Sequence, residues 1–244
     1  MDFVIVILSL PFWLPLCVLT VLWVKLSSRG PLLFCQNRIG QGGQPFKMFK
    51  FRSMHPNAET DVHEQHFEQL VKSNKPMTKL DALGDSRLIP GGAWLRAFCL
   101  DELPQILNVV RGEMSIVGPR PCTPREFGLY TEQQKERVCI HPGLTGLWQV
   151  EGKNKTTFEE MIALDIEYGR AISVGRDLSI IACTIPAIVS QLRESRKKAK
   201  ALEKPLRVAK ESHPSKPAQK PGDSELYLHR TGKKNDSPKH TNVA

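Results

Sequence analysis

The N-terminal segment constrains the fold most, because residues 3–24 form an uninterrupted run without a charged side chain. The 22 residues of this run match the roughly 17–25 that a helix needs to cross a bilayer. A secretory signal peptide is the alternative, but Asp2 is the only charged side chain ahead of the run, and no small-residue cleavage site precedes Lys25. We therefore predict a membrane-embedded helix over residues 1–26.

Two prolines, Pro11 and Pro15, stand in the middle of this run. Each proline removes a backbone donor and presses against the carbonyl four residues earlier, so we expect a kink. A kinked helix can cross the bilayer or re-enter on the same side, and the sequence alone leaves both forms open. Lys25 and Arg29 follow the run closely, which places its C-terminal end in the cytoplasm.

The net charge of +9 is unevenly distributed along the 244 residues. Residues 191–244 contain 14 basic and 6 acidic side chains, which leaves 20 basic and 19 acidic side chains for residues 1–190. The excess charge therefore belongs to a tail and does not indicate a domain that binds nucleic acid. The tail is rich in Lys, Pro, Ser and Gly, so we predict that residues 192–244 are disordered and attract anionic lipid headgroups weakly.

Two apolar stretches, residues 32–39 and 45–54, flank the glycine-rich segment 40–43, which is the pattern of a β-hairpin. In the second stretch Lys47, Lys50 and Arg52 alternate imperfectly with apolar side chains. This pattern fits either a functional cationic face or an ordinary solvated strand face.

The richest signal begins at residue 96 with the segment RAFCLDELPQ, followed by GEMSIVGPRP at residues 112–121. Apolar residues at 103, 106, 107 and 110 repeat at helical spacing, so Asp101 and Glu102 occupy the first turn of a predicted helix. An acidic pair in a first turn commonly does no more than complement the helix dipole. Here, however, Arg96 precedes the pair and Arg120 stands between two prolines, a combination that suits chemistry on a phosphate group.

Beyond this region we predict a solvated helix over residues 131–137 and a last apolar helix over residues 177–189. The second is too short to cross a membrane and contains Pro186, so it is expected on the protein or in the membrane interface. Between them lie the segments PGLTGLWQVEGKN, residues 142–154, and LDIEY, residues 164–168.

These motifs resemble the bacterial sugar transferases, the monotopic polyprenyl-phosphate phosphoglycosyl transferases, from about residue 2 to residue 191. The resemblance rests on RAFCLDELPQ, GPRP and the two later segments, and on QNRIG and KFRSM at residues 36–40 and 50–54. The sequence departs from the family pattern at Cys99, which replaces Ser or Thr, and at Lys153, which replaces Arg. Leu14-Pro15 stands where the family has a Ser-Pro pair.

The resemblance implies an α+β, monotopic membrane protein with a re-entrant helix kinked at Pro15, a small β-hairpin and a mostly helical cytosolic catalytic domain over residues 27–191. It implies that Asp101 and Glu102 are the catalytic pair. Chemistry then favours Asp101 as the nucleophile and Glu102 as the ligand of Mg²⁺, which binds few carboxylates together with substrate phosphates. The residues expected to bind substrate are Arg38, Lys50, Arg52, Arg96, Arg120, Lys153, Asp165 and Tyr168.

The implied reaction transfers a sugar-1-phosphate from a UDP-sugar to polyprenyl (undecaprenyl) phosphate at the cytoplasmic face of the bacterial inner membrane, releases UMP and initiates assembly of a membrane-linked glycan. The sequence leaves open the sugar, the glycan and whether the chain forms a homo-oligomer. A non-enzymatic membrane scaffold with a lipid-binding tail is the alternative. That reading explains the apolar segment and the tail, but gives no reason for Arg96, the acidic pair or the Pro-Arg-Pro turn.

Overall fold

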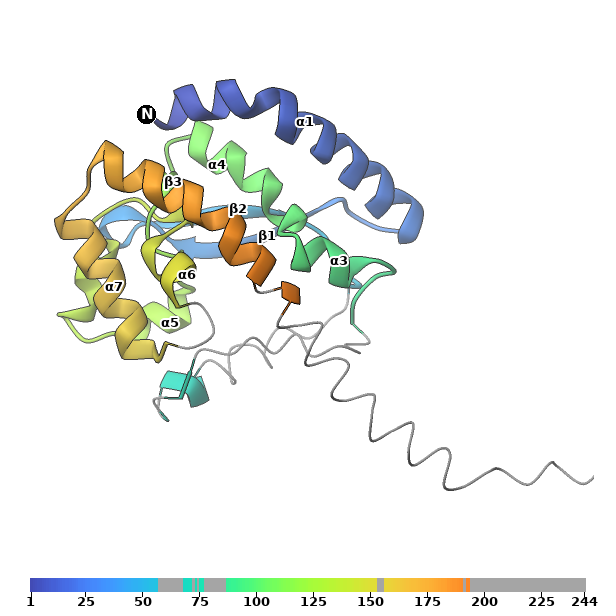
Figure 1. The fold of residues 1–244 in the computed structure, drawn as a ribbon. Coiled ribbons are helices and arrows are strands. Elements are labelled where there is room, and N and C mark those ends of the chain that lie inside the picture. The colour runs from blue at the N-terminus through green and yellow to red at the C-terminus, as the bar shows by residue number, and fades with distance from the viewer. Residues whose placement is uncertain are drawn as a thin grey trace, which may run out of the picture. The chain divides into compact units, whose positions relative to one another are not determined.

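The computed structural model describes residues 1–56, 68–71, 73, 75–76, 87–152, 156–190 and 192–193. All of these residues fall within one compact unit, Met1–Leu202. Short helices surround two small sheets of two strands each, so the fold class is α+β as predicted (Figure 1). Lys153 and residues 194–244, which include nearly all of the predicted tail, lie outside the described residues.

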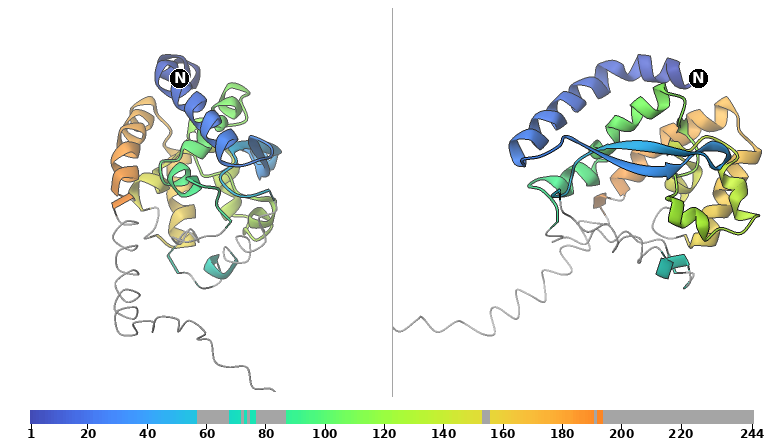
Figure 2. Two further views of the ribbon diagram at one scale, coloured as in Figure 1. Left: turned by 90° about the vertical axis from the view of Figure 1, so that its right-hand side faces the viewer. Right: turned by 180° about the vertical axis from the view of Figure 1, so that it is seen from behind.

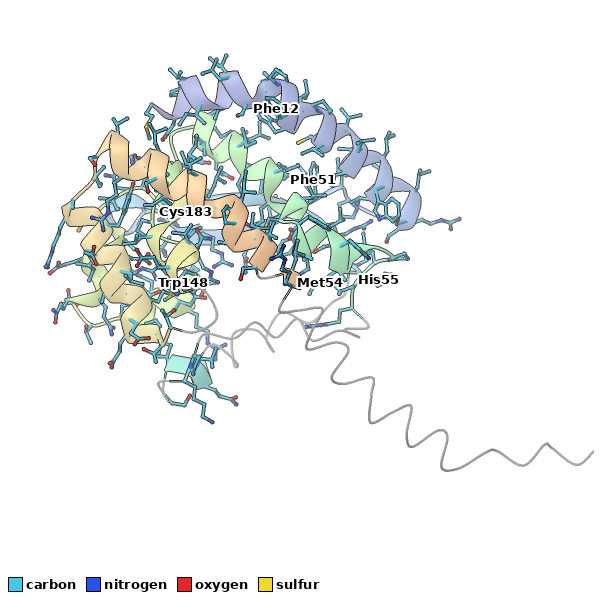
Figure 3. All side chains as sticks on the ribbon, viewed as in Figure 1. Phe12, Phe51, Met54, His55, Trp148 and Cys183 are labelled. Atoms are coloured by element: carbon cyan, nitrogen blue, oxygen red, sulfur yellow. The ribbon has the colours of Figure 1, made fainter. Side chains whose placement is uncertain are left out.

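The long apolar helix α1 spans Asp2–Ser27 and continues through Pro11 and Pro15. It curves along one side of the domain, next to α4 (Figures 1 and 2). Within the part of the chain that the structure describes, it is the one helix whose length and composition would let it cross a membrane. Its outer side is apolar and exposed, and Phe12 projects from it (Figure 3).

Strands β1 (Leu33–Ile39) and β2 (Pro45–Phe51) form the predicted antiparallel hairpin, in register from Leu33 opposite Phe51 to Ile39 opposite Pro45. The short 3-10 helix η1 (Gln41–Gly43) joins them. Gly42 and Gly43 have positive φ angles of 66° and 78°, a backbone region that glycine adopts readily. The hairpin lies on the side of the domain that faces the reader in the rear view of Figure 2.

The helix predicted to begin at the acidic pair is divided into two pieces, the 3-10 helix η2 (Leu100–Gln105) and α4 (Ile106–Val110), and a separate short helix, α3 (Gly92–Ala97), precedes it. Because η2 has 3-10 turns and contains Pro104, its side chains follow a different period from those of a regular α-helix. The predicted apolar stripe is only partly covered, because on α4 Leu107 and Val110 are exposed, whereas the polar Asn108 is buried.

The second half of the domain contains a short parallel pair, β3 (Ser115–Val117) and β4 (Gly143–Thr145), and four named helical pieces. Thr123 and Thr157 begin α5 and α7 with reciprocal hydrogen bonds to a glutamate three residues later. The last described helix covers residues 174–190, so the predicted helix over 177–189 is present and longer. The named pieces are α5 (Pro124–Gly128), η3 (Gln134–Val138), α6 (Leu147–Glu151) and α7 (Phe158–Arg170).

The prediction of a solvated helix over residues 131–137 was wrong in one important respect. The segment forms the 3-10 helix η3, and Arg137 is buried within the domain. Burial is tolerated because three groups accept hydrogen bonds from its guanidinium: Tyr130, Asp165 and the carbonyl of Arg120.

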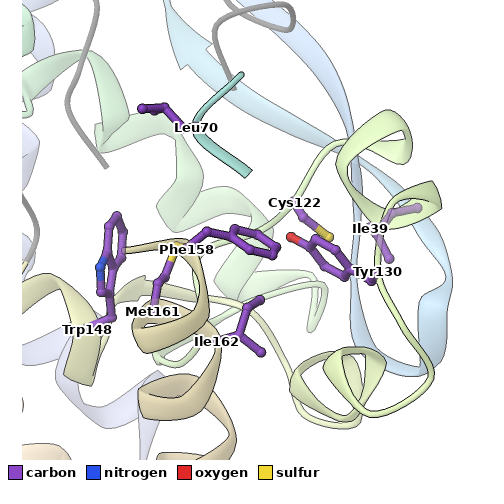
Figure 4. Close-up of a cluster of buried hydrophobic side chains, with 8 residues drawn as sticks. All are labelled: Ile39, Leu70, Cys122, Tyr130, Trp148, Phe158, Met161 and Ile162. Carbon is purple, nitrogen blue, oxygen red and sulfur yellow. The ribbon is translucent and has the colours of Figure 1, made fainter. Parts of the chain in front are cut away.

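Two of the four apolar clusters among the described residues join the hairpin to the helices around it. One gathers side chains from β1, α6 and α7 and from the segments around α5; its buried members are Ile39, Leu70, Cys122, Tyr130, Trp148, Phe158, Met161 and Ile162 (Figure 4). The other joins α1 to the hairpin and α4 through Val6, Met48, Val109 and Met114, with Trp13 packed against them. The second cluster fixes α1 against the domain on its inner side.

Candidate active site

The acidic pair lies on η2, directly after a tight change of chain direction at Cys99. Cys99 has a φ angle of 56°, and it is the one non-glycine residue with positive φ among the described residues. Its side chain forms no capping hydrogen bond, although its backbone carbonyl accepts from the amide of Glu102 at 3.1 Å. Backbone strain of this kind concentrates at functional sites, and it stands two residues before Asp101.

Lys50 of β2 reaches across to Glu102, and the Lys50 Nζ to Glu102 Oε1 distance is 2.9 Å. The two side chains are 23% and 36% exposed, respectively. Asp101 is more enclosed, with 7% of its surface exposed. The hairpin and η2 therefore bring together three of the residues that the sequence singled out.

The next part of the site is on β1, where Arg38 is buried beside Gln36. Both Nε and Nη2 of Arg38 donate to Gln36 Oε1, at 3.2 and 2.7 Å, and Nη1 donates to the carbonyl of Pro121 at 2.8 Å. Burial, followed by the neighbouring charge of Arg120, lowers the pKa of Arg38 to about 10, while Glu126 and, to a smaller extent, Glu102 act in the opposite direction. Arg38 is therefore within electrostatic range of both Arg120 and Glu102.

Arg120 lies in the turn after β3, and its Nη1 is 3.2 Å from Glu126 Oε2 on α5. The negative charge of Glu126 raises the pKa of Arg120, although burial opposes this effect. Burial alone would raise the pKa of Glu126, but the charges of Arg120, Arg38 and Arg137 hold it below its ordinary value. Glu126 is therefore ionised, and it orients the guanidinium of Arg120.

Beneath this turn lies a buried network centred on Arg137, whose side chain is fully enclosed. Arg137 donates to Tyr130 Oη at 2.7 Å, to Asp165 Oδ2 at 2.5 Å and to the carbonyl of Arg120 at 3.1 Å. Burial alone would lower the pKa of Arg137, but Tyr130 and Asp165 hold it above its ordinary value. Together with Arg38 and Arg120, the network contains three guanidinium groups and two carboxylates.

Asp165 and Tyr168 are on α7, and their side chains already have partners inside the protein. Asp165 binds Arg137, whereas Tyr168 donates to Asp177 Oδ1 at 2.7 Å. Burial raises the pKa of Tyr168, and Asp177 adds to the effect. These contacts connect α7 to η3 and to the helix over residues 174–190, so both side chains act within the scaffold, and their expected contact with substrate remains a prediction.

Arg52 and Arg96 lie on the side of the site nearer the end of α1. The two Nη groups of Arg52 donate to the carbonyls of Ser28 and Arg29, at 2.8 and 2.9 Å, just after α1 ends. Arg52 thus ties the C-terminal end of α1 to the hairpin. Arg96 lies on α3 and is half-buried.

The sequence pointed to the carboxylates and to several of the cations, but missed four buried or half-buried partners. The capping pattern TPRE at residues 123–126 was a detectable signal for Glu126. Asn108 and Arg137 carry no local signal, because partners of each are distant in sequence or belong to the backbone, whereas Gln36 stands two residues before its partner Arg38. The four residues are Gln36, Asn108, Glu126 and Arg137.

Comparison with known proteins agrees with the motifs. The exopolysaccharide production protein ExoY of Sinorhizobium fredii is 40% identical over 187 residues, which cover 77% of this chain and 83% of that protein. ExoY of Rhizobium meliloti is 40% identical over 177 residues, covering 71% and 77% of the two chains. The UDP-glucose:undecaprenyl-phosphate glucose-1-phosphate transferase of Caulobacter vibrioides is 38% identical over 198 residues, covering 78% and 68%.

The acidic pair, the cations around it and α1 all fall within the part of the chain that matches a known family. The model of the family described as bacterial sugar transferase matches residues 1–191. The chain therefore belongs to the bacterial sugar transferase family.

Proposed function

We propose that this sugar transferase moves a sugar-1-phosphate from a UDP-sugar to polyprenyl phosphate through a phosphosugar bound to Asp101. The observation that carries the proposal is the adjacent pair Asp101 and Glu102, held on η2 against Lys50. The name of the Caulobacter relative, with its UDP-glucose and undecaprenyl-phosphate substrates, supports the choice of donor and acceptor. Transfer to such a lipid would initiate synthesis of an exopolysaccharide or another membrane-linked glycan.

The first displacement begins when a carboxylate oxygen of Asp101 attacks the phosphorus that bears the sugar. The bond from this phosphorus to the bridging oxygen breaks, and UMP leaves with the electron pair. In the second displacement, a phosphate oxygen of the lipid attacks the same phosphorus, and the bond to Asp101 breaks. Asp101 is regenerated, and the product is a polyprenyl diphosphate sugar. Two displacements replace one difficult step by two easier ones.

The cations around the acidic pair can compensate the charge of the diphosphate. Lys50 is already within hydrogen-bond distance of Glu102, and the planar fork of Arg120 matches a pair of phosphate oxygens. We assign Lys50 and Arg120 to the phosphates, with Arg38 supporting Arg120 through the carbonyl of Pro121. Arg96 is assigned to the acceptor side, because α3 packs against the end of α1.

Mg²⁺ fits this chemistry as a partner shared with the substrate. Among the described residues, no group of three or more His, Cys, Asp or Glu side chains could hold a metal by itself. Mg²⁺ characteristically binds one or two carboxylates together with substrate phosphates, which matches the pair on η2. Glu102 is the ligand that we assign, and bound Mg²⁺ would neutralise charge on the phosphate oxygens.

The membrane helix keeps the acidic pair close to a lipid acceptor. One side of α1 packs on the hairpin and α4, and the other side is exposed and apolar. Trp94 and Phe98, which stack on each other at 5.7 Å, add exposed aromatic surface near α3. Aromatic side chains favour the level of the lipid headgroups. We propose that α1 re-enters the inner membrane from the cytoplasmic face.

The catalytic proposal is tested with the purified full chain in detergent. Wild type should release UMP from a panel of UDP-sugars when undecaprenyl phosphate is present. Without acceptor, mass spectrometry should find a phosphosugar on Asp101, and Asp101→Asn should abolish both turnover and adduct. An adduct on another residue, or full activity of Asp101→Asn, would overturn the mechanism.

The topology is tested by labelling. A cysteine introduced by Asp2→Cys should stay inaccessible to an impermeant reagent applied from the periplasm. Labelling of this cysteine in intact cells would show a spanning helix. Replacing Pro15 by Leu should increase the spanning fraction if the proline determines the re-entrant form.

A further inference from the structure

The side chain of Asn108 makes three hydrogen bonds, and no part of the proposed chemistry uses it. It lies on α4, with no exposed surface. Its Oδ1 accepts from the amide of Phe49 at 3.1 Å, and its Nδ2 donates to the carbonyl of Lys47 at 2.8 Å. The same Nδ2 donates to Glu113 Oε2 at 2.6 Å.

The two contacts with β2 imitate a neighbouring strand. Lys47 and Phe49 are two residues apart, so their backbone groups lie along one edge of β2. A peptide group of an adjacent strand would satisfy the same acceptor and donor, and here a single side-chain amide does so. This arrangement fixes α4 along the strand as well as against it, because a shift in register would break both hydrogen bonds.

The contacts between Asn108 and β2 lie close to the reactive groups, both on the strand and on the helical segment formed by η2 and α4. On the strand, Lys50 is the next residue after Phe49. On the helical side, η2 continues directly into α4, so Asn108 and Glu102 belong to one continuous helical segment. The Lys50–Glu102 contact of 2.9 Å and the Asn108 contacts therefore join the same two elements at neighbouring places.

From this geometry we infer that Asn108 is a positioning residue, which sets Lys50 against the carboxylates of η2. The identity of the side chain follows from its partners, because the site requires one acceptor and two donors within short reach. Aspartate has the same shape but lacks both donors, and it would place a second carboxylate beside Glu113.

The inference rests on the proposed function, and its test uses UMP release by the full chain with the UDP-sugar that wild type turns over. We expect kcat of Asn108→Asp to fall about 100-fold, the scale of a 1 Å misplacement of reacting groups. The KM for UDP-sugar should change less than about threefold, since Asn108 itself does not touch the donor and both Lys50 and Arg120 remain present to bind its phosphates. Asn37→Asp is the matched control: Asn37 is exposed on β1 opposite Lys47, and its kcat should stay within about twofold.

A double-mutant cycle separates positioning from general support of the fold. If Asn108 acts through Lys50, then Asn108→Asp should cost no more than about threefold when Lys50 is already methionine. The same 100-fold loss in the Lys50→Met background would refute the inference, as would near-normal kcat of Asn108→Asp.

Cooperative thermal unfolding of each variant shows whether it is folded under assay conditions. Asn108→Ser, which introduces no charge, serves as a second variant if Asn108→Asp does not fold, and failure of both would make the role purely structural and overturn the inference. A wild-type chain that releases no UMP would instead count against the proposed function, so the two failures can be distinguished.

Discussion

Two ion pairs of similar length have opposite surroundings in this protein. In the first, Lys50 and Glu102 are 2.9 Å apart and 23% and 36% exposed. In the second, Arg137 and Asp165 are 2.5 Å apart and 0% and 2% exposed. The first pair can exchange its partners for a phosphate or a metal ion at small cost, because water already compensates part of each charge. The second pair cannot, because each buried charge depends on the other.

The difference divides the site into a part that changes partners and a part that holds position. Arg120 connects the two parts. Its guanidinium lies beside Glu126, and its carbonyl accepts from Arg137. The buried pair of Arg137 and Asp165 therefore supports the backbone of Arg120, whose side chain is assigned to the substrate. Substitutions in the buried pair should therefore mainly lower stability, whereas substitutions in the exposed pair, Lys50 and Glu102, should mainly lower turnover.

The largest expected effect is the loss of stability in Arg137→Met. Removal of one member of a buried ion pair leaves the other charge without compensation and typically costs about 3–5 kcal/mol. Denaturant unfolding of the purified chain measures this loss. Arg170→Met is the matched control, because Arg170 and Glu136 are 2.7 Å apart but 68% and 45% exposed. The control should lose about 1 kcal/mol or less, and equal losses in both variants would erase the contrast between the two kinds of pair.

The second effect concerns the exposed pair. Glu102→Gln should reduce kcat by about 10²–10³-fold, the usual penalty for losing one group that stabilises developing charge. It should also raise the Mg²⁺ concentration needed for half-maximal rate, with little change in unfolding. A Mg²⁺ titration of UMP release measures both quantities. An unchanged Mg²⁺ requirement would remove Glu102 from the metal site.

The contrast also explains what the sequence could and could not predict. The hairpin was predictable because apolar stretches flank a glycine-rich turn, and the acidic pair because its motif is local. Arg137 was not predictable, because its segment, TEQQKER, contains mainly polar and charged residues and looks like a solvated helix. Its partner Asp165 lies 28 residues away, so only the tertiary fold shows that the two charges are buried together.

Asn108 is a second residue whose burial the sequence did not predict, although the helix that carries it was predicted. The apolar pattern at residues 103, 106, 107 and 110 correctly predicted helical structure. It did not predict which face is buried: within the α-helix α4, Leu107 and Val110 are exposed, whereas Asn108 and Val109 are buried. The buried face is polar at Asn108, where the partners are backbone groups of β2. Sequence patterns of side chains do not reveal partners of this kind.

A third effect is expected where the two parts of the site meet. Arg120→Lys keeps the charge beside Glu126 but loses the planar fork, so the KM for UDP-sugar should rise about tenfold while stability changes little. Arg125→Lys is the control, since Arg125 pairs with Glu68 at 2.6 Å outside the site. Steady-state kinetics over a range of UDP-sugar concentrations separates KM from kcat. A similar rise in the control would show that the effect comes from α5 and not from the phosphate contact.

The smallest effect is expected from removing residues 192–244. The comparison of the two ion pairs assumes that residues 1–191 supply all the positive charge that the reaction needs. Residues 191–244 contain 14 basic side chains, so a catalytic contribution from them would break that assumption.

Their composition cannot bury a core, and the match to the family ends at residue 191. A chain ending at Gln191 should therefore turn over within about threefold of the full chain in detergent, where no anionic lipid attracts the tail. A loss of more than tenfold, about 1.4 kcal/mol of barrier, would mean that the tail completes the cationic part of the site.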